Sequence, residues 1–457
     1  MKWVHMAGFE RWTVDPDWAS PYQEVRRGGT ILRYVPDLLL QVQNTPSAAV
    51  VELVGDVTAR VAAFGARSRN RDLSLLYTTL LKSESISSSM IEGYQVPPSE
   101  VVLTEFAPSV TNSTALIIHR NILALQESLR GLHDVWTIDG IHRVLLALLP
   151  DHPTGFRTTQ VRIGGRSLFR AAFVPPSSSV VPALMDDLVG YANSGPESIV
   201  TKAAIVHAQF ETIHPYNDGN GRTGRALIHA LFARAGLLPG AVLPVSTVLK
   251  ARSEEYIGAL TAYRYDADAG QTRQDAIDAF VLIFVQALND AVTLAQLVAE
   301  DVALIEADWA ERMAHVRADS TAAWAVKSLP NHPALTIESL AGRAGVTKAA
   351  AGRAVSRLVD AGILAELQGK YKKSAVFVAP QVMELLTYCE RRAASPDLDT
   401  LESQPQIPGP RPSSPLVILC GAAMPRVQVT CVLNKGHTGR HRSRRSSPGI
   451  QASTLAS

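Results

Sequence analysis

Twelve consecutive residues bring a base, an acid and two arginines together in the order His214-Pro215-Tyr216-Asn217-Asp218-Gly219-Asn220-Gly221-Arg222-Thr223-Gly224-Arg225. Gly219 and Gly221 can adopt backbone conformations that are closed to other residues, so their amides can turn inward around an anion. The mostly apolar run 226–235 follows directly and predicts a helix. The free N–H groups and the dipole at the N-terminus of this helix favour a bound phosphate.

The charged side chains of this stretch suit nucleotide chemistry. His214 is the side chain whose unperturbed pKa allows proton transfer near neutrality. Asp218 is a hard oxygen ligand suited to Mg²⁺ that is shared with phosphates. Arg222 and Arg225 are three residues apart, so we expect them to point the same way on a helix. A Gly-rich turn before a basic helix is the plain alternative, but the order of all twelve positions favours a nucleotide site.

The stretch resembles the signature of the Fic family, His-Pro-Phe-x-Asp/Glu-Gly-Asn-Gly-Arg-x-x-Arg. Tyr216 replaces the usual Phe, and we expect its ring to pack in the core and its hydroxyl to find a partner at the edge. The resemblance implies a protein adenylyltransferase, which moves AMP from ATP to a Ser, Thr or Tyr hydroxyl of a target protein. His214 would then take the hydroxyl proton, Asp218 would hold Mg²⁺, and Arg222 and Arg225 would meet the outer phosphates.

The resemblance also implies further ATP-binding residues, which are Gly219, Asn220, Gly221, Thr223, Gly224 and Tyr256. Tyr256 matches an aromatic position that is common in the family near the nucleotide base. Arg252 lies four residues before Tyr256, at a position where the family often has Asn. The chain thus departs from the family pattern at a residue expected near the nucleotide base.

A second stretch, Ser88-Ser89-Met90-Ile91-Glu92-Gly93, ends a helix expected over about residues 73–91. It resembles the family's inhibitory motif, Ser/Thr-x-x-x-Glu-Gly/Asn, and lies before the core motif as in the N-terminally inhibited class. Ser88, Glu92 and Gly93 are its matching residues. The resemblance implies that Glu92 forms a bidentate pair with Arg225 and takes the place of the γ-phosphate. A solvated glutamate at a helix end is the alternative.

The segment 155–165 lies before the core motif and contains Gly164-Gly165 between β-capable residues, which predicts a tight hairpin turn. It resembles the family's flap, which adds a strand to an extended stretch of the target protein. The residues expected to bind the target are Val161, Arg162, Ile163, Gly164 and Gly165. An ordinary hairpin edge is the alternative.

Apolar periodicity predicts a mainly α fold, with helices near residues 48–64, 113–132, 138–149, 180–192, 199–213, 247–263 and 272–316. The first of these should bury one stripe, formed by Val51, Leu53, Val54, Val57, Val61 and Phe64. We interpret His207 as a core histidine whose hydrogen bonds are satisfied.

Residues 320–380 resemble a winged helix-turn-helix, with a helix over 348–361 and a hairpin turn at 368–370. The inner face of that helix should hold Ala354, Val355, Leu358 and Val359. Lys348, Arg353 and Arg357 could face DNA. Such modules also dock proteins or form dimers, and the modest basic surface leaves DNA binding and docking equally open.

The C-terminal segment is Pro/Ser-rich from residue 393 to 415, which predicts disorder. Four residues beyond it have side chains that suit tetrahedral Zn²⁺, namely Cys420, Cys431, His437 and His441. A disordered basic tail is the alternative to a zinc site.

The length of 457 residues predicts two or three domains. The net charge of +2 gives no overall electrostatic field that would attract nucleic acid or a membrane surface. We place the boundaries at 1–110 for an N-terminal region with the inhibitory helix, 111–315 for the Fic catalytic domain, 320–380 for the winged helix-turn-helix and 393–457 for a flexible basic tail. Three cysteines give no disulfide framework. Residues 1–11 lack the pattern of a signal peptide. Uninterrupted apolar runs such as 279–285 are too short to span a bilayer. We expect a cytoplasmic protein that binds ATP and a target protein and does not bind a membrane. Whether it forms a homodimer stays open.

Two other functions stay open at this point. The same scaffold can remove AMP or use another nucleotide, and a matched Glu92 keeps removal open. Alternatively, the domain only senses nucleotide for a DNA-binding regulator. An intact His214 favours chemistry, because sensing ATP needs no base there.

Overall fold

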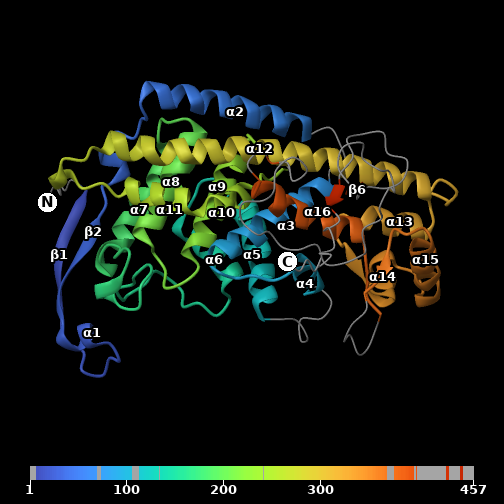
Figure 1. Ribbon diagram of the computed structural model, residues 1–457, viewed down its shortest axis with the longest axis horizontal. Helices are drawn as coiled ribbons and strands as arrows, with labels where there is room; N and C mark the ends of the chain where they lie inside the picture. Colours follow the sequence, from blue (N-terminus) through green and yellow to red (C-terminus); the bar gives the residue numbers. More distant parts are fainter. Residues whose placement is uncertain are drawn as a thin grey trace, which may run out of the picture. The chain divides into compact units, whose positions relative to one another are not determined.

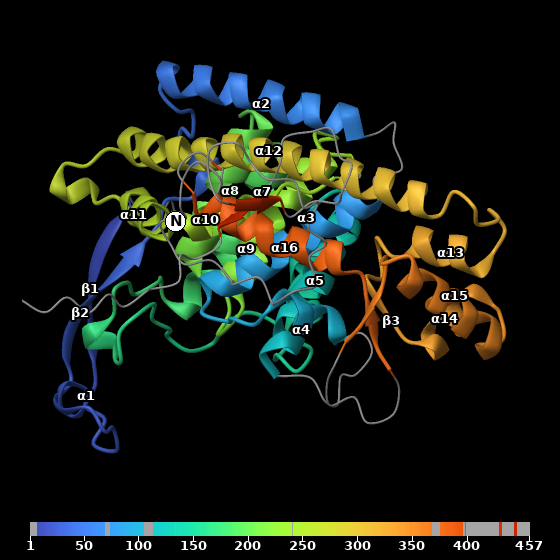
Figure 2. The same cartoon turned by 45° about the vertical axis from the view of Figure 1, so that its right-hand side comes forward.

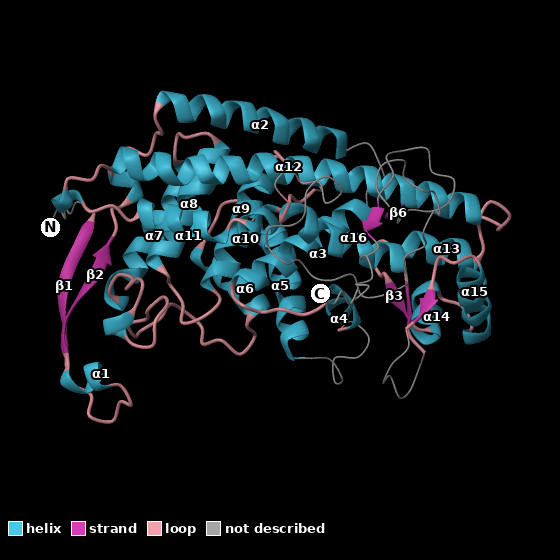
Figure 3. Ribbon diagram, in the orientation of Figure 1, coloured by secondary structure: helices cyan, strands magenta, loops and turns pink. Residues whose placement is uncertain are grey.

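The computed structural model describes residues 7–68, 74–104, 113–132, 134–239, 241–367, 375–395, 398, 429–431 and 443–445. These residues form two compact units. The first unit comprises residues 1–73, 80–96 and 111–296, and the second comprises residues 74–79, 97–110 and 297–457. Helices dominate the described residues and the strands are short (Figure 3). The predicted mainly α fold is therefore confirmed.

The first unit begins with an antiparallel pair, β1 (Gly8–Val14) and β2 (Gly29–Val35), in which Trp12 faces Ile31. Its other elements are α1 (Gln23–Arg27), η1 (Leu39–Gln41), α2 (Ala48–Ser68), the greater part of α3 (Ser74–Ile91), α5 (Ser113–Gly131), α6 (Ile138–Leu148), η2 (Leu168–Arg170), η3 (Ser178–Val180), α7 (Val181–Ser194), α8 (Ile199–Ile213), α9 (Asn220–Arg234), α10 (Val245–Ala251), α11 (Ser253–Tyr263), η4 (Ala267–Ala269) and the first part of α12 (Arg273–Arg312).

Two adjacent helices, α8 and α9, form the centre of this unit (Figure 1). In α8 every residue from 200 to 213 is buried except Lys202, and in α9 residues 220–232 are all buried. A helix that is buried on every side needs apolar or internally paired residues all round, and α8 has apolar residues on all its faces. The turn between α8 and α9 carries the core motif, so the motif lies inside the unit.

Helix α2 lies alongside α12 in both ribbon views (Figures 1 and 2), and Arg60 of α2 donates a hydrogen bond to Thr293 of α12 at 3.1 Å. The face that α2 buries differs from the predicted stripe. Val51 and Leu53 are 45% and 44% exposed, while Val50 is buried. The predicted Val54, Val57, Val61 and Phe64 are buried as expected. Periodicity predicted the helix correctly, but the stripe was placed about one residue off at its start.

The predicted tight turn at Gly164-Gly165 is wrong. Ile163 pairs with Phe173 in one isolated bridge, and residues 164–172 form a wider loop that contains η2. Both glycines have positive φ, but a Cβ on Gly165 would lie 1.9 Å from the carbonyl oxygen of Arg170. The glycines therefore let the loop fold onto itself instead of closing a two-residue hairpin. Residues 155–176 contain no strand.

The predicted single helix over 247–263 is two helices, α10 and α11. The backbone leaves helical geometry at Arg252, where φ is −114° and ψ is 42°. The guanidinium of Arg252 is paired with Asp290 of α12.

The second unit contains α4 (Pro98–Leu103), α13 (Thr321–Ser328), β3 (Ala334–Leu335), α14 (Ile337–Ala344), α15 (Lys348–Asp360), β4 (Ala365–Glu366), β5 (Phe377–Val378), α16 (Pro380–Ala393), β6 (Val429–Cys431) and β7 (Ser443–Arg445), with the rest of α3 and α12. Strands β3, β5 and β4 form an antiparallel sheet in that order. The helix expected over 348–361 is present as α15, and the identity of residues 320–380 as a winged helix-turn-helix stays a prediction. Val359 was expected inside but is 37% exposed, because α15 buries only Ala351, Ala354, Val355 and Leu358.

Several predicted features lie outside the described residues. They are the hairpin turn at 368–370 and the side chains of Cys420, His437 and His441. Only the backbone of Cys431 is described, in β6. The zinc site therefore stays a prediction.

Among the described residues, α12 is long and apolar enough to cross a membrane by length and composition alone. An 18-residue window has a mean hydropathy of 1.7, and 56% of it is buried inside the protein. A core helix passes the same test, so the evidence for a membrane span is weak. Uninterrupted apolar runs alone indicated that no segment is long enough to span a bilayer. That criterion was too narrow, because a charged residue such as Asp290 interrupts an apolar run without ending the helix.

Candidate active site

The turn before α9 is held by its own side chains. Gly219 has φ 78°, in the left-handed region, and forms the N-cap of α9. The Asn220 amide clamps the turn, because its Oδ1 accepts from Tyr216 N and its Nδ2 donates to Tyr216 O, both at 2.9 Å. The side chain of Asn220 therefore stabilises the turn, and only its backbone remains available to bind an anion. The predicted turn at a helix N-terminus is found.

The ring of Tyr216 is fully buried, as predicted, between aromatic neighbours that include Phe156, with ring centroids 5.9 Å apart, and His142, at 5.6 Å. Its hydroxyl has no hydrogen-bond partner among the residues that the structure describes. The expectation of a partner at the ring edge is therefore not met there.

His214 ends α8 in the left-handed conformation, with φ 51° and ψ 62°. Arg157 holds this conformation from the flap segment: its Nε donates to His214 O at 2.8 Å, and its Nη2 donates to Pro176 O at 2.6 Å and Ile213 O at 3.3 Å. Burial, together with the nearby Arg264 and Arg157, lowers the pKa of His214 to about 3. The imidazole is therefore neutral at physiological pH, which is the form that accepts a proton.

Sequence reasoning gave Arg157 no role. Its buried cation meets only carbonyl oxygens in its described contacts, including Thr159 O at 3.1 Å, and it joins the flap segment to the end of α8. An arginine near the start of a flap carries no local signal that it supports a histidine 57 residues later.

Arg225 and Glu92 form the predicted ion pair, with Nη2 and Oε1 2.9 Å apart. The pair is not bidentate as predicted. Arg225 Nε donates to Ser88 Oγ at 2.9 Å, and Nη2 also donates to Ser88 O at 2.7 Å. Ser88 therefore takes the position that a second carboxylate oxygen would have. Gly93 has φ 86°, consistent with its predicted place at the end of the helix.

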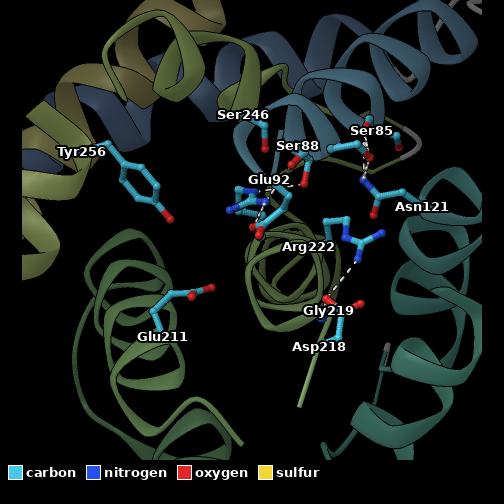
Figure 4. Close-up of polar contacts among 12 residues, drawn as sticks. Ser85, Ser88, Glu92, Asn121, Glu211, Asp218, Gly219, Arg222, Ser246 and Tyr256 are labelled. Atoms are coloured by element: carbon cyan, nitrogen blue, oxygen red, sulfur yellow. Dashed lines mark hydrogen bonds and ion pairs between the residues drawn. The ribbon is translucent and has the colours of Figure 1, made fainter. Parts of the chain in front are cut away.

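Glu92 also covers the glycine turn. A Cβ on Gly221 would lie 1.9 Å from Glu92 Oε1, so only glycine admits the carboxylate here. Figure 4 shows Glu92 reaching α9 from the end of α3, with Arg222 joined to Asp218 on the other side. A negatively charged group thus already occupies the cradle that the sequence predicted for phosphate.

Arg222 is 1% exposed, yet its Nε and Nη1 have no hydrogen-bond partner among the described residues. Its Nη2 lies 3.5 Å from Asp218 Oδ1, and its guanidinium lies 4.9 Å from the ring centre of Tyr94. Buried donors are normally paired, so unpaired donors on a buried arginine suit an incoming anion. Arg222 and Arg225 both face the segment 88–94, as expected for residues three apart on a helix.

Tyr256 lies in the core of the unit, with its hydroxyl hydrogen-bonded to His207 Nε2 at 2.8 Å. The two rings are stacked, with an interplanar angle of 14°. The core position expected for His207 is found, and its Nε2 is satisfied, but its Nδ1 has no hydrogen-bond partner among the described residues, so the expectation of fully satisfied hydrogen bonds is met only in part. A contact of Tyr256 with the nucleotide base stays a prediction.

The fold and site together define a helical domain whose glycine turn, two buried arginines and neutral histidine suit phosphate chemistry. Residues 133–232 match the model of the Fic/DOC family, so the chain contains a Fic domain.

Two similar curated proteins carry the name protein adenylyltransferase. Protein adenylyltransferase fic-1 of Caenorhabditis elegans is 34% identical over 155 residues, which cover 30% of this chain and 28% of that protein. Probable protein adenylyltransferase aq_aa38 of Aquifex aeolicus (strain VF5) is 38% identical over 109 residues, covering 24% and 30%. The chain thus spans less than a third of the length of these relatives. A crystal structure of a Fic family protein from Desulfovibrio desulfuricans G20 is 22% identical and covers 73% of this chain and 97% of its own, with a TM-score of 0.46.

Proposed function

We propose that this protein transfers AMP from ATP to a hydroxyl of a target protein, and that Glu92 keeps the transfer switched off. The observation that carries the proposal is the position of Glu92, which pairs with Arg225 and covers Gly221 at the start of α9. A carboxylate bound by an arginine and a glycine turn marks a site built for anions. The similarity to adenylyltransferases over the Fic domain supports ATP as the source of that anion.

The transfer uses residues of the motif. His214 Nε2 takes the proton of the target hydroxyl while the hydroxyl oxygen bonds to the α-phosphorus. The bond from that phosphorus to the bridging oxygen of the β-phosphate breaks, and pyrophosphate leaves. Gly219 and Gly221 amides and the free donors of Arg222 stabilise the phosphate oxygens. The flap segment, from Val161 to Gly165, guides the target by strand addition.

Asp218 is the residue that would hold Mg²⁺. Its side chain is 59% exposed, and carboxylate oxygen is the ligand type that Mg²⁺ prefers. The described residues contain no group of three or more His, Cys, Asp or Glu side chains that could hold a metal ion. The remaining ligands would therefore be phosphate oxygens and water, and the ion would neutralise phosphate charge.

Inhibition follows from the same contacts. With Glu92 on Arg225, the γ-phosphate loses its guanidinium and meets a negative charge. ATP then binds with its α-phosphate misplaced, and a displacement of about 1 Å can cost roughly 10²-fold in rate.

The test compares wild type, Glu92→Gly and Glu92→Gly/His214→Ala after incubation with α-labelled ATP. We expect strong labelling of the protein itself or of lysate proteins only in Glu92→Gly, with a far smaller change in ATP affinity by calorimetry. Arg225→Ala should not mimic Glu92→Gly, because it deletes the phosphate ligand along with the inhibitory contact. Equal labelling of wild type and Glu92→Gly would refute the inhibitory role, and no labelling in any variant would refute the transfer.

A further inference from the structure

A buried carboxylate, that of Glu211, lies beside the histidine proposed as the base. Glu211 is on α8, three residues before His214, and its Oε2 lies 4.0 Å from His214 Nδ1. The left-handed backbone of His214 folds its side chain back toward the last turn of α8. Figure 4 shows Glu211 pointing from α8 toward α9 and Glu92.

Both groups have unused hydrogen-bonding capacity. Glu211 Oε1 and His214 Nδ1 have no hydrogen-bond partner in the part of the chain that the structure describes. Buried polar atoms without partners are uncommon and call for an explanation. Catalytic hydrogen bonds are often long without substrate and shorten when substrate binds, so a separation of 4.0 Å is compatible with a pair that closes in the complex.

The motif makes room for this carboxylate. A Cβ on Gly224 would lie 2.5 Å from Glu211 Oε1 and 3.3 Å from His207 Nδ1. Any side chain at position 224 would therefore displace Glu211. Because φ is not in the left-handed region at Gly224, its missing side chain is explained by space, not by backbone conformation.

Charged and titratable groups from several elements face the pair. Glu211 is surrounded by Arg225 of α9, Tyr256 of α11, Arg264 after α11 and Glu92 after α3, and His214 is also faced by Arg157 and Asp218. Burial raises the pKa of Glu211 to about 7, with Arg225 lowering it and Glu92 raising it. Glu211 is thus mainly neutral below about pH 7 and ionised above it.

We propose that Glu211 is a positioning residue for His214, whose carboxylate accepts a hydrogen bond from Nδ1–H and so leaves Nε2 free to take the proton of the target hydroxyl. The proposal rests on the transfer of AMP proposed above. When Nε2 takes the proton, the imidazole becomes positively charged, and the negative Glu211 stabilises that charge through Nδ1–H. Glu211 itself touches no reacting atom.

The kinetic test uses the Glu92→Gly protein as parent and Glu211→Gln as the matched variant, which keeps size and removes charge. We expect kcat to fall by roughly 10²-fold, since an oriented base contributes about 10²–10⁴-fold, with KM for ATP unchanged. In the parent, kcat should rise with pH through the ionisation of Glu211, and this rise should be absent in Glu211→Gln. Glu211→Asp should retain the rise at a lower rate, whereas a purely structural role would change stability and leave the pH profile intact.

A second readout does not depend on transfer. Nitrogen-15 NMR of His214 above pH 7 should show the proton on Nδ1 in wild type and a mixture of tautomers in Glu211→Gln. A proton on Nε2 in wild type, or a Glu211→Gln variant with the parent's kcat and pH profile, would overturn the role of Glu211. If the parent transfers no AMP, the proposed function fails, while the tautomer still decides whether Glu211 orients His214.

Discussion

At the scale of single residues, His214 combines an unusual backbone conformation with the side chain that we propose as the catalytic base. Non-glycine residues with positive φ are uncommon, and His and Asn are among those that tolerate it best. Arg157 compensates by bonding the carbonyls of Ile213 and His214. Backbone strain of this kind is characteristic of functional sites, where the surroundings hold it in place.

Two substitutions of His214 should distinguish the effect of losing the base from the effect of its left-handed backbone conformation. In a Glu92→Gly background, His214→Ala and His214→Asn should both lose about 10²–10⁴-fold in transfer rate while ATP affinity by calorimetry stays nearly unchanged. His214→Asn should melt at the higher temperature of the two, because Asn tolerates positive φ better than Ala. His315→Ala, at an exposed position, serves as the control substitution. Full transfer in His214→Asn would show that another group accepts the proton.

At the scale of elements, α3 is attached to its neighbours by polar contacts. Glu84 of α3 accepts from His229 Nε2 at 2.9 Å and from Ser246 N at 2.7 Å, so it joins α3 to α9 and α10. Asn121 of α5 donates to Ser85 O at 2.8 Å and Ser89 Oγ at 3.1 Å. Because Glu84, Ser85 and Ser89 are buried, these contacts fix the position of α3 against its neighbours.

Glu84→Gln should loosen this attachment without touching the anion site. The amide keeps an acceptor for Ser246 N but loses the charge, and leaving buried partners unsatisfied costs about 1–3 kcal/mol. We expect faster amide hydrogen exchange in α3 and more AMP transfer than in wild type, though less than in Glu92→Gly. Ser194→Ala, which removes an exposed hydroxyl from α7, is the control. Faster exchange together with wild-type transfer would mean that Glu92 stays in place when α3 loosens.

At the scale of the whole molecule, the second unit presents a basic helix of modest charge. Arg353 and Arg357 are exposed on α15, while Lys348 lies 2.5 Å from Glu338 in an exposed pair. Such exposed pairs contribute little and can open for another anion. These side chains are compatible with DNA binding or with docking of a protein.

Duplex DNA should bind weakly to the full chain, with affinity that falls as salt rises, because phosphate contacts release counterions. Arg357→Ala should reduce the salt slope by about one if that side chain contacts a phosphate. Lys327→Ala removes the same charge from an exposed position on α13 and should leave the slope unchanged. Fluorescence anisotropy at several salt concentrations measures both. Failure to bind DNA at low salt would favour protein docking.

The elements that sequence reasoning located correctly depend on neighbours in the chain. The N-terminus of α9 at Gly219, the end of α3 near Gly93 and most helix bounds follow from glycine conformation and apolar periodicity. The ion pair of Glu92 with Arg225 was predicted from two matching motifs, since no local pattern links residues 133 positions apart. Other contacts between residues far apart in the chain could not be predicted from the sequence, for the same reason. Arg157 supports His214 across 57 positions and Glu84 meets His229 across 145, and only packing brings such pairs together. Periodicity predicts that α2 and α15 are helical, but their neighbours select the buried stripe, which is why Val51 and Val359 are exposed.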